Sequence, residues 1–214
     1  MTSLTLIRHG ETDWNAARRI QGSTDIPLND TGRGQARDAA VALRESLDLA
    51  APVVVVASDL SRARETAEII AAELGLHVSR LYPDLRERAY GEAEGVDSTE
   101  FSARWGDWHT AEVPGAEPWP HLRARGLRAL RHVVRDARRE TAPVAAAGSS
   151  DGAAVVSRSS VIVVTHGAMI RELIRHATGG ELPLAGERLA NGSAHAMLHE
   201  RERLRLVSMA PVGV

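Results

Sequence analysis

The sequence contains no cysteine and no lysine, and each absence removes a class of chemistry. Without cysteine, the chain can form no disulfide, no cysteine-ligated zinc site and no thiolate nucleophile. Without lysine, it has no Schiff-base amine and no P-loop lysine. All 26 basic residues are therefore arginine, whose planar guanidinium can hold an oxyanion through two parallel hydrogen bonds.

Long hydrophobic runs are also missing, because no apolar stretch approaches the ~20 residues of a membrane-spanning helix. The first residues lack the basic and apolar regions of a secretory signal. The net charge of -2 is not the cationic excess typical of nucleic-acid or membrane-surface binders. We therefore expect a cytoplasmic protein whose partners include neither nucleic acid nor membrane.

Short runs of β-branched and other apolar residues alternate with helical patterns along the chain. Three continuous apolar runs are typical of parallel strands buried on both faces, and two later patterns also indicate strands. These five segments are Leu4–Ile7, Val53–Ala57, Val161–Thr165, 194–198 and 204–209. Such alternation predicts an α/β fold with three α/β/α layers around a mainly parallel central sheet.

Helical patterns fill the segments between the predicted strands. Thr31 is placed to cap a helix that runs to about Leu47, and Ser61 to cap one that runs to Leu74. Further helical patterns cover residues 118–140 and 167–177.

No internal repeat divides the chain, and we expect one domain over residues 1–214. Residues 142–160 are rich in Ala, Gly and Ser, which predicts a flexible surface loop within that domain.

Two of the predicted strands end in a histidine followed by a glycine. These segments are Leu6-Ile7-Arg8-His9-Gly10 and Val164-Thr165-His166-Gly167. Ligands of parallel α/β sheets bind beyond the carboxyl ends of the strands, so we expect both imidazoles to face one crevice. A glycine after each histidine allows the backbone to approach a ligand closely.

Arg62 and Glu87 follow other predicted elements and fit the same crevice. Arg62 falls in the first turn of its helix, where a bound anion would help to accommodate its charge. With Arg8 it would form a pocket for a dianion. Glu87 could protonate a leaving oxygen and then deprotonate water, although a salt bridge with Arg86 or Arg88 is an alternative role.

Four ordered motifs make the chain resemble the histidine phosphatase, or phosphoglycerate mutase-like, superfamily. One such motif would be weak evidence, but four in order along nearly the whole chain are specific. They are Arg8-His9-Gly10-Glu11-Thr12 with Trp14-Asn15, Gln21-Gly22, Asp25, Pro27-Leu28, Gly32 and Gln35-Ala36; the segment around Arg62; the segment around Glu87; and Thr165-His166-Gly167 with Asn191-Gly192-Ser193.

The resemblance implies a role for each motif residue. His9 would be the nucleophile that takes the phosphoryl group, and Glu87 the general acid and then the base. Arg8, Arg62 and His166 would hold the phosphoryl oxygens and offset their charge, so that neither a metal ion nor another cofactor is needed. Further phosphate or substrate contacts would come from Asn15, Gln21, Gly22, Arg88, Tyr90 and Gly167.

Three functions remain open within this resemblance. The first is hydrolysis of a small-molecule phosphomonoester by a monomer or homodimer. The second is a cofactor-dependent phosphoglycerate mutase, which Glu87-Arg88-Ala89-Tyr90 favours. The missing lysine and the missing arginine pair between Gly95 and Glu117 oppose the mutase, and a short, arginine-poor cover should admit water. We therefore favour the phosphatase. The third function, non-catalytic phosphate binding, would require a damaged site, whereas all the expected groups are present.

The other histidines and the tryptophans carry less information. The histidines outside the two motifs show no metal-ligand spacing, and no acidic and histidine set for two metals is present. Trp105, Trp108 and Trp119 cluster in a chain with 3% aromatic residues, and we expect them to pack in the core rather than to contact substrate.

Overall fold

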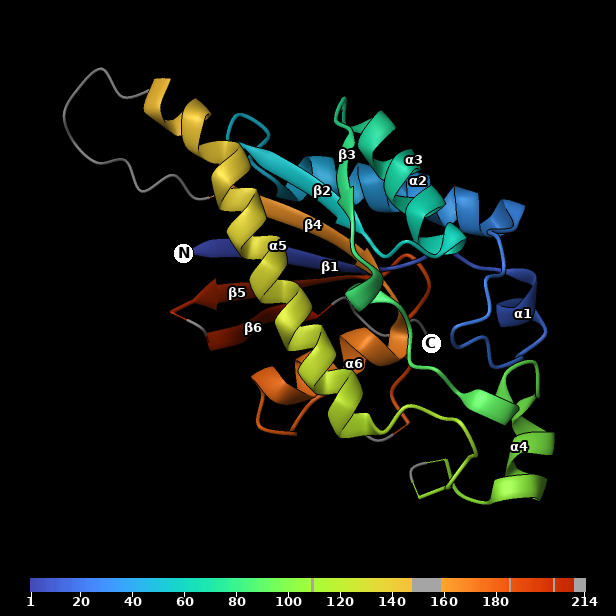
Figure 1. The fold of residues 1–214 in the computed structure, drawn as a ribbon. Helices are drawn as coiled ribbons and strands as arrows, with labels where there is room; N and C mark the ends of the chain where they lie inside the picture. Colours follow the sequence, from blue (N-terminus) through green and yellow to red (C-terminus); the bar gives the residue numbers. More distant parts are fainter. Residues whose placement is uncertain (109, 148–158, 185, 202, 210–214) are drawn as a thin grey trace.

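The protein is built around one six-stranded, mostly parallel sheet (Figure 1). The computed structural model describes residues 1–108, 110–147, 159–184, 186–201 and 203–209. The strands lie in the order β3-β2-β4-β1-β5-β6. Strands β1 to β4 are parallel, and β5 and β6 form an antiparallel hairpin beside β1. Their bounds are β1 Thr2–Arg8, β2 Val53–Ala57, β3 Val78–Leu81, β4 Ser159–Thr165, β5 Ala194–Glu200 and β6 Arg203–Met209.

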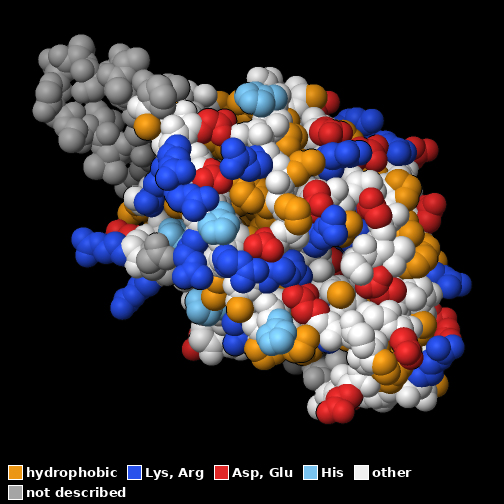
Figure 2. Space-filling view, in the orientation of Figure 1, with side chains coloured by type: hydrophobic (Ala, Val, Ile, Leu, Met, Phe, Trp, Pro, Cys, Tyr) orange, Lys and Arg blue, Asp and Glu red, His pale blue; other side chains and the backbone are white. Residues whose placement is uncertain are grey.

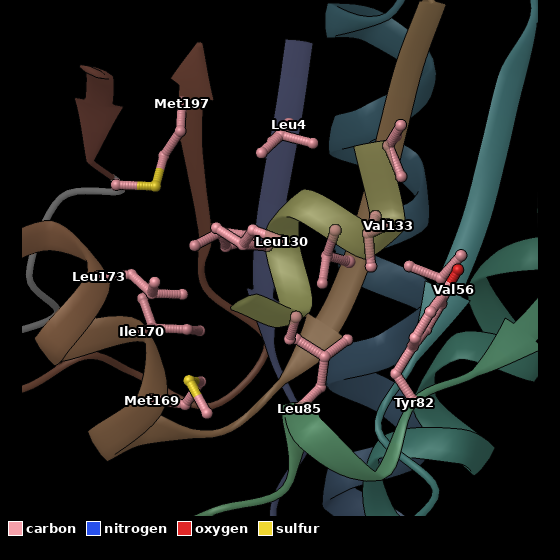
Figure 3. Close-up of a cluster of buried hydrophobic side chains, with 14 of the residues drawn as sticks. Leu4, Val56, Tyr82, Leu85, Leu130, Val133, Met169, Ile170, Leu173 and Met197 are labelled. Carbon is pink, nitrogen blue, oxygen red and sulfur yellow. The ribbon is translucent and has the colours of Figure 1, made fainter. Parts of the chain in front are cut away.

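Helices cover both faces of the sheet, which confirms the predicted three-layer α/β fold (Figure 1). Leu4 and Leu6 of β1 point toward helices α5 and α6, whereas Ile7 points toward helices α2 and α3. Figure 3 shows Leu130 of α5 and Leu173 of α6 in the same buried cluster as Leu4. The helix bounds are α2 Asp30–Ser46, α3 Ser61–Glu73, α5 Trp119–Ala147 and α6 Gly167–Ala177.

The central strands are apolar because they are covered on both faces. In β4, which lies between β2 and β1, the run from Val161 to Val164 is at most 1% exposed. Alternate side chains of a strand reach opposite faces, so a continuous apolar run fits only a strand that both helical layers cover. The expectation of buried parallel strands is thereby confirmed for β1, β2 and β4.

Short elements gather beyond the carboxyl ends of the parallel strands (Figure 1). They enclose a third, smaller cluster around Tyr90, Val96 and Phe101. The sequence patterns did not predict these elements, which lack the length needed for a clear apolar period. They are α1 Asp13–Ala16, two 3-10 turns at Pro83–Leu85 and Gly91–Ala93, and α4 Ser98–Trp105.

The predicted helix caps at Thr31 and Ser61 are wrong, although both helices lie where expected. Helix α2 begins after Asn29, whose side-chain oxygen accepts from Gly32 N at 2.8 Å. Helix α3 begins at Ser61 without a side-chain cap from the preceding residue. Instead, Asp25 Oδ1 accepts from both Ser61 N (2.8 Å) and Ser61 Oγ (2.7 Å). The cap of α3 therefore comes from a distant loop, which no local pattern reveals.

The predicted loop at 142–160 is partly wrong, because α5 continues to Ala147 and β4 begins at Ser159. The helix therefore extends past 140, the end of the predicted helical segment. Alanine has the highest helix propensity, which favours this continuation. Residues 148–158, the rest of the predicted loop, lie outside the described residues.

Charged side chains of both signs cover the outer side of α5. Figure 2 shows arginine and acidic residues interspersed over this face. Asp136 accepts from Arg80 at 2.9 Å, and Arg128 donates to Asp84 at 3.1 Å. In the part of the chain that the structure describes, no helix is long and apolar enough to cross a membrane.

A close backbone contact between Gly10 and Gly32 fixes the start of α2 against the segment after β1. A Cβ atom on Gly32 would lie 2.1 Å from Glu11 O, whereas one on Gly34 would meet nothing within 4 Å. We predict that Gly32→Ala lowers the free energy of unfolding by about 2 kcal/mol or more, because backbone atoms must move. Gly34→Ala, the matched control, should raise it by up to ~1 kcal/mol through helix propensity. Urea unfolding of both variants tests this, and equal effects would contradict it.

Candidate active site

Two histidines meet at the carboxyl ends of adjacent strands. His9 follows β1 and His166 follows β4, and their ring centroids are 5.1 Å apart. The strand pairing continues past the strand ends, because His9 N donates to Thr165 O at 2.9 Å. His9 is 3% exposed and His166 is fully buried. Parallel register thus brings the two rings together, but only His9 lines a cavity of about 750 Å³, whereas His166 lies buried behind it.

The tautomer of His9 follows from one hydrogen bond. Its Nδ1 lies 2.7 Å from Gly10 O, and a carbonyl oxygen can only accept, so Nδ1 carries the proton. The lone pair is therefore on Nε2. Burial, then the charges of Arg62 and Arg8, hold the pKa of His9 well below its ordinary value of 6.5. A neutral imidazole with a free Nε2 is the form that a nucleophile requires.

Arg62, which is buried, and Arg8, which is half-buried, are cations held by carbonyl oxygens. Arg62 is fully buried, and its two terminal nitrogens donate to Gly22 O (2.8 Å) and Thr24 O (2.9 Å). Arg8 donates to Leu189 O. The Nε atom of each arginine is buried without a protein partner. Burial is the main cause that lowers the pKa of both. These arginines leave much of their charge for an anion in the cavity.

His166 is oriented by a serine that the sequence did not single out for this role. Its Nε2 lies 2.9 Å from Ser58 Oγ, and Ser58 follows β2, the strand on the far side of β4. Its Nδ1 is buried without a partner. Burial, then the charge of Arg62, places the pKa of His166 well below 6.5. Three adjacent strands therefore contribute to the arrangement of the two rings.

Glu87 lies at the cavity wall, where it accepts three backbone N–H groups. Its Oε1 accepts from Arg88 N (2.9 Å) and Met169 N (3.2 Å), and its Oε2 accepts from Ala168 N (3.0 Å). Two of these donors belong to the first turn of α6, which has no side-chain cap of its own. The alternative salt bridge with Arg86 does not form, because Arg86 binds Asp59 at 2.5 Å.

The remaining predicted contacts divide into two groups. Asn15, Gln21, Gly22 and Gly167 line the cavity with the catalytic candidates. The Oδ1 of Asn15 accepts from Thr12 N and Asn191 Nδ2, both at 3.2 Å, which leaves its amide nitrogen to donate to an anion. Asn191 also donates to His9 O at 2.9 Å, a positioning role that only its motif had suggested.

Arg88 and Tyr90, both predicted to contact substrate, differ in their position relative to the cavity. Tyr90 lines the cavity, whereas Arg88 does not. The guanidinium of Arg88 lies between aromatic rings, 4.2 Å from the centroid of Trp119 and 4.7 Å from that of Tyr90. Its Nε donates to Glu117 O at 2.7 Å. In this geometry, Arg88 supports the aromatic wall of the cavity.

Several lining residues were missed or assigned elsewhere by the sequence reasoning. Trp108 and Trp119 line the cavity. The expected core packing is found for Trp105, against the third cluster, and for Trp119, which also packs against the main core, whereas Trp108 is exposed. Arg171 and Arg188 also line it. Arg171 lies four residues after Gly167 and thus on the same face of α6, a spacing that the sequence did offer. Arg188 precedes the Asn191 motif and carried no signal.

No group of three or more His, Cys, Asp or Glu in the described part of the chain is placed to hold a metal ion. The cationic groups that line the cavity are arginines, and His9 lies among them as a neutral imidazole. Such a cavity has the composition of a phosphate site that can also supply a nucleophile.

The fold and the arginine-rich cavity that contains His9 define a phosphoryl-transfer enzyme of the α/β class. The chain belongs to the histidine phosphatase superfamily (branch 1), whose model matches residues 4–211. It is 34% identical over 207 residues to an uncharacterized phosphatase, PhoE, of Bacillus subtilis, covering 96% of this chain and 93% of that one.

Two other relatives have more specific names. A metal-independent phosphoserine phosphatase of Arabidopsis thaliana is 33% identical over 213 residues, covering 95% of this chain and 78% of the relative. A mycobacterial glucosyl-3-phosphoglycerate phosphatase, solved with VO3, has a TM-score of 0.75 at 28% identity, covering 97% of this chain and 98% of that one. Relatives named probable phosphoglycerate mutase also match, over about half of this chain.

Glu94 holds the loop that orients Arg62. Its carboxylate accepts from the backbone and side chain of both Ser23 and Thr24 at 2.5–2.9 Å, and from Tyr90 N at 3.0 Å. The carbonyl groups of Gly22 and Thr24 in turn bind Arg62. Burial alone would raise the pKa of Glu94, but these hydrogen bonds outweigh burial and lower it. The hydrogen bonds of ionised Glu94 therefore stabilise the fold fully above the pKa that Glu94 has in the unfolded chain. This stabilisation is lost as pH falls through the lowered pKa that Glu94 has in the folded protein.

We predict that Glu94→Gln reduces phosphatase kcat/KM about 10- to 100-fold, because Arg62 loses its fixed orientation. Glu92→Gln replaces an exposed carboxylate on the same 3-10 turn and should have little effect. Steady-state kinetics and thermal melting of both variants separate lost orientation from lost folding. A Glu94→Gln variant with unchanged kcat/KM would contradict the role.

Proposed function

We propose that this protein is a metal-independent phosphomonoester hydrolase that acts on a small phosphorylated molecule through a phosphohistidine on His9 Nε2. The observation that carries the proposal is the Nδ1 bond of His9 to Gly10 O, which directs the lone pair to Nε2 inside a cationic cavity. The names of the full-length relatives, which are phosphatases, agree with hydrolysis.

In the first half-reaction, Nε2 of His9 attacks phosphorus as the bond to the leaving oxygen breaks. Arg8 and Arg62 line the cavity and offset the charge on the equatorial oxygens of the transferring group, and His166, packed against His9, contributes as a neutral hydrogen-bonding group. Glu87 at the cavity wall delivers a proton to the leaving oxygen.

In the second half-reaction, water attacks the phosphohistidine on the side that the alcohol has left. Glu87, now ionised, accepts a proton from that water, and the N–P bond breaks to release phosphate and neutral His9. The hydrogen bond from Nδ1 to Gly10 O keeps the ring in one orientation during both steps. Glu87 thus regains from water the proton that it gave to the leaving oxygen, and the phosphoryl group leaves as free phosphate.

The second candidate is the phosphoglycerate mutase reaction. It is favoured by the relatives named probable phosphoglycerate mutase, which match over about half of this chain. That reaction requires a phosphohistidine protected from water. The relatives matched over nearly the full chain are phosphatases, and the guanidinium of Arg88 is taken up by the Trp119 and Tyr90 rings and Glu117 O. Hydrolysis therefore remains the better-supported reaction.

His9→Ala should abolish turnover, with kcat lowered by at least ~10⁴-fold, because no other group can replace the attacking nitrogen. Phosphate release from p-nitrophenyl phosphate in excess chelator measures it, with His132→Ala, away from the cavity lining, as a matched control. Chelator-sensitive turnover would disprove metal independence. Rapid-quench labelling should trap an acid-labile phosphoenzyme in wild type alone, and turnover without His9 would disprove the mechanism.

The pH dependence of kcat/KM follows from the lowered pKa of His9. Free enzyme needs neutral His9, which forms above its folded pKa. Because burial and the two arginines lower that pKa, the ascending limb should lie below pH 6.5, not at it. Rates of p-nitrophenyl phosphate hydrolysis, corrected for substrate ionisation, measure the limb. NMR titration of the imidazole identifies whether the limb belongs to His9. An ascending limb that belongs to His9 and lies at or above pH 6.5 would contradict the prediction.

A further inference from the structure

The active-site cavity continues into a second cavity of about 360 Å³. Four residues line both cavities and form the passage between them: Trp108, Trp119, Arg171 and Arg188. None of the four is needed to hold the transferring phosphoryl group in the proposed reaction. A leaving group that extends from the phosphoryl site toward the second cavity would pass these four residues.

The two arginines of this passage keep their charge available. Arg171 donates to the backbone oxygen of Glu187, and Arg188 is exposed. The carboxylates nearby are engaged elsewhere. Glu172 binds Arg123 at 2.9 Å and Arg175 at 3.9 Å, and the carboxylate of Glu187 accepts from Leu184 N at 2.7 Å. Over the described residues, neither Arg171 nor Arg188 therefore has a carboxylate ion-pair partner.

The position of the arginines favours an anion between them and the catalytic centre. Burial lowers the pKa of Arg171 and is likewise the main cause of the lowered pKa of Arg8, to which the positive charge of Arg188 also contributes. A second anion of the substrate would relieve this like-charge repulsion. Trp108 and Trp119 line the same passage and place apolar ring surface beside the arginines.

We infer that Arg171 and Arg188 form a specificity subsite for a second anionic group, carboxylate or phosphate, on the leaving group of the substrate. The inference rests on the proposed function and narrows its substrate class to small phosphomonoesters with two separated anions. Guanidinium groups suit both anions because their paired N–H groups match two oxygens.

Matched ligand pairs test the subsite. One pair is 3-phosphoglycerate and glycerol 3-phosphate, which differ only by a carboxylate in place of a hydroxymethyl group. The other is fructose 1,6-bisphosphate and fructose 6-phosphate, which differ by a second phosphate. Calorimetry on the His9→Ala variant measures the Kd of each ligand without turnover. The kcat/KM of the active enzyme measures how efficiently each ligand is hydrolysed.

We expect at least one anionic partner to bind about 10-fold more tightly than its neutral counterpart, which corresponds to ~1.4 kcal/mol. Arg171→Gln or Arg188→Gln should remove most of this preference, through KM rather than kcat. p-Nitrophenyl phosphate, whose leaving group carries no second anion, is the reference substrate, and each variant should lose much less kcat/KM on it than on the anionic partner. Arg37→Gln, an exposed charge removal on α2, should retain the preference.

The outcomes separate the subsite from the proposed function. A preference confined to 3-phosphoglycerate would assign a carboxylate, and one confined to the bisphosphate would assign a phosphate. No preference in either pair, or a preference that survives both arginine substitutions, would overturn the subsite. Absence of His9-dependent hydrolysis would instead overturn the proposed function, and the binding measurements would still decide the subsite.

Discussion

Burial of two arginines at one edge of a sheet is the electrostatic constraint on which the rest of the site depends. An isolated buried charge is expensive, and proteins commonly offset it with a carboxylate. Here Arg8 and Arg62 are held by backbone carbonyl oxygens. Carbonyl dipoles reduce the cost without cancelling the charge, so a dianion entering the cavity completes the solvation of both arginines. The fold thus stores unfavourable electrostatics that phosphate binding relieves.

This constraint explains why loops far apart in the chain are fixed so closely. The carbonyl groups can hold Arg62 only if residues 22–24 keep one conformation, and Glu94 fixes that conformation through four hydrogen bonds from Ser23 and Thr24. At the other side, Asn191 binds His9 O and Asn15 Oδ1, and its segment supplies the carbonyl of Leu189 to Arg8. Hydrogen bonds therefore fix the loops at the sheet edge, as apolar packing fixes the elements of the core.

The parts of the fold that the sequence predicts are those governed by local pattern. Strands β1, β2 and β4 carry continuous apolar runs because helices cover both their faces. Strand β3 escaped prediction because its Ser79 and Arg80 lie at the sheet edge, where no apolar period is required. The contact of Asp25 with the start of α3 also escaped prediction, because it spans 36 residues and leaves no local pattern in the sequence.

The site follows the same rule. His9, His166, Arg8 and Arg62 were identified from ordered motifs, because strand ends fix where these side chains must lie. Trp119 was assigned to the core because aromatic residues are usually buried, yet it forms part of the cavity wall with Arg88 stacked on it. Residues that contact a variable leaving group need no shared spacing, so Arg171 and Arg188 required the structure to be connected with the site.

Charge arrangement also bears on hydrolysis versus transfer. The phosphoryl pocket is lined by buried groups, whereas Arg188 at the passage is exposed, so water can reach the cavity from that side. In the proposed reaction, departure of a leaving group that carries a second anion would open the passage, and water could then take its place before Glu87. A transferase would have to keep an acceptor there instead. The same two arginines that select the leaving group would then, once it departs, leave a polar route for water, which favours hydrolysis as the fate of the phosphohistidine.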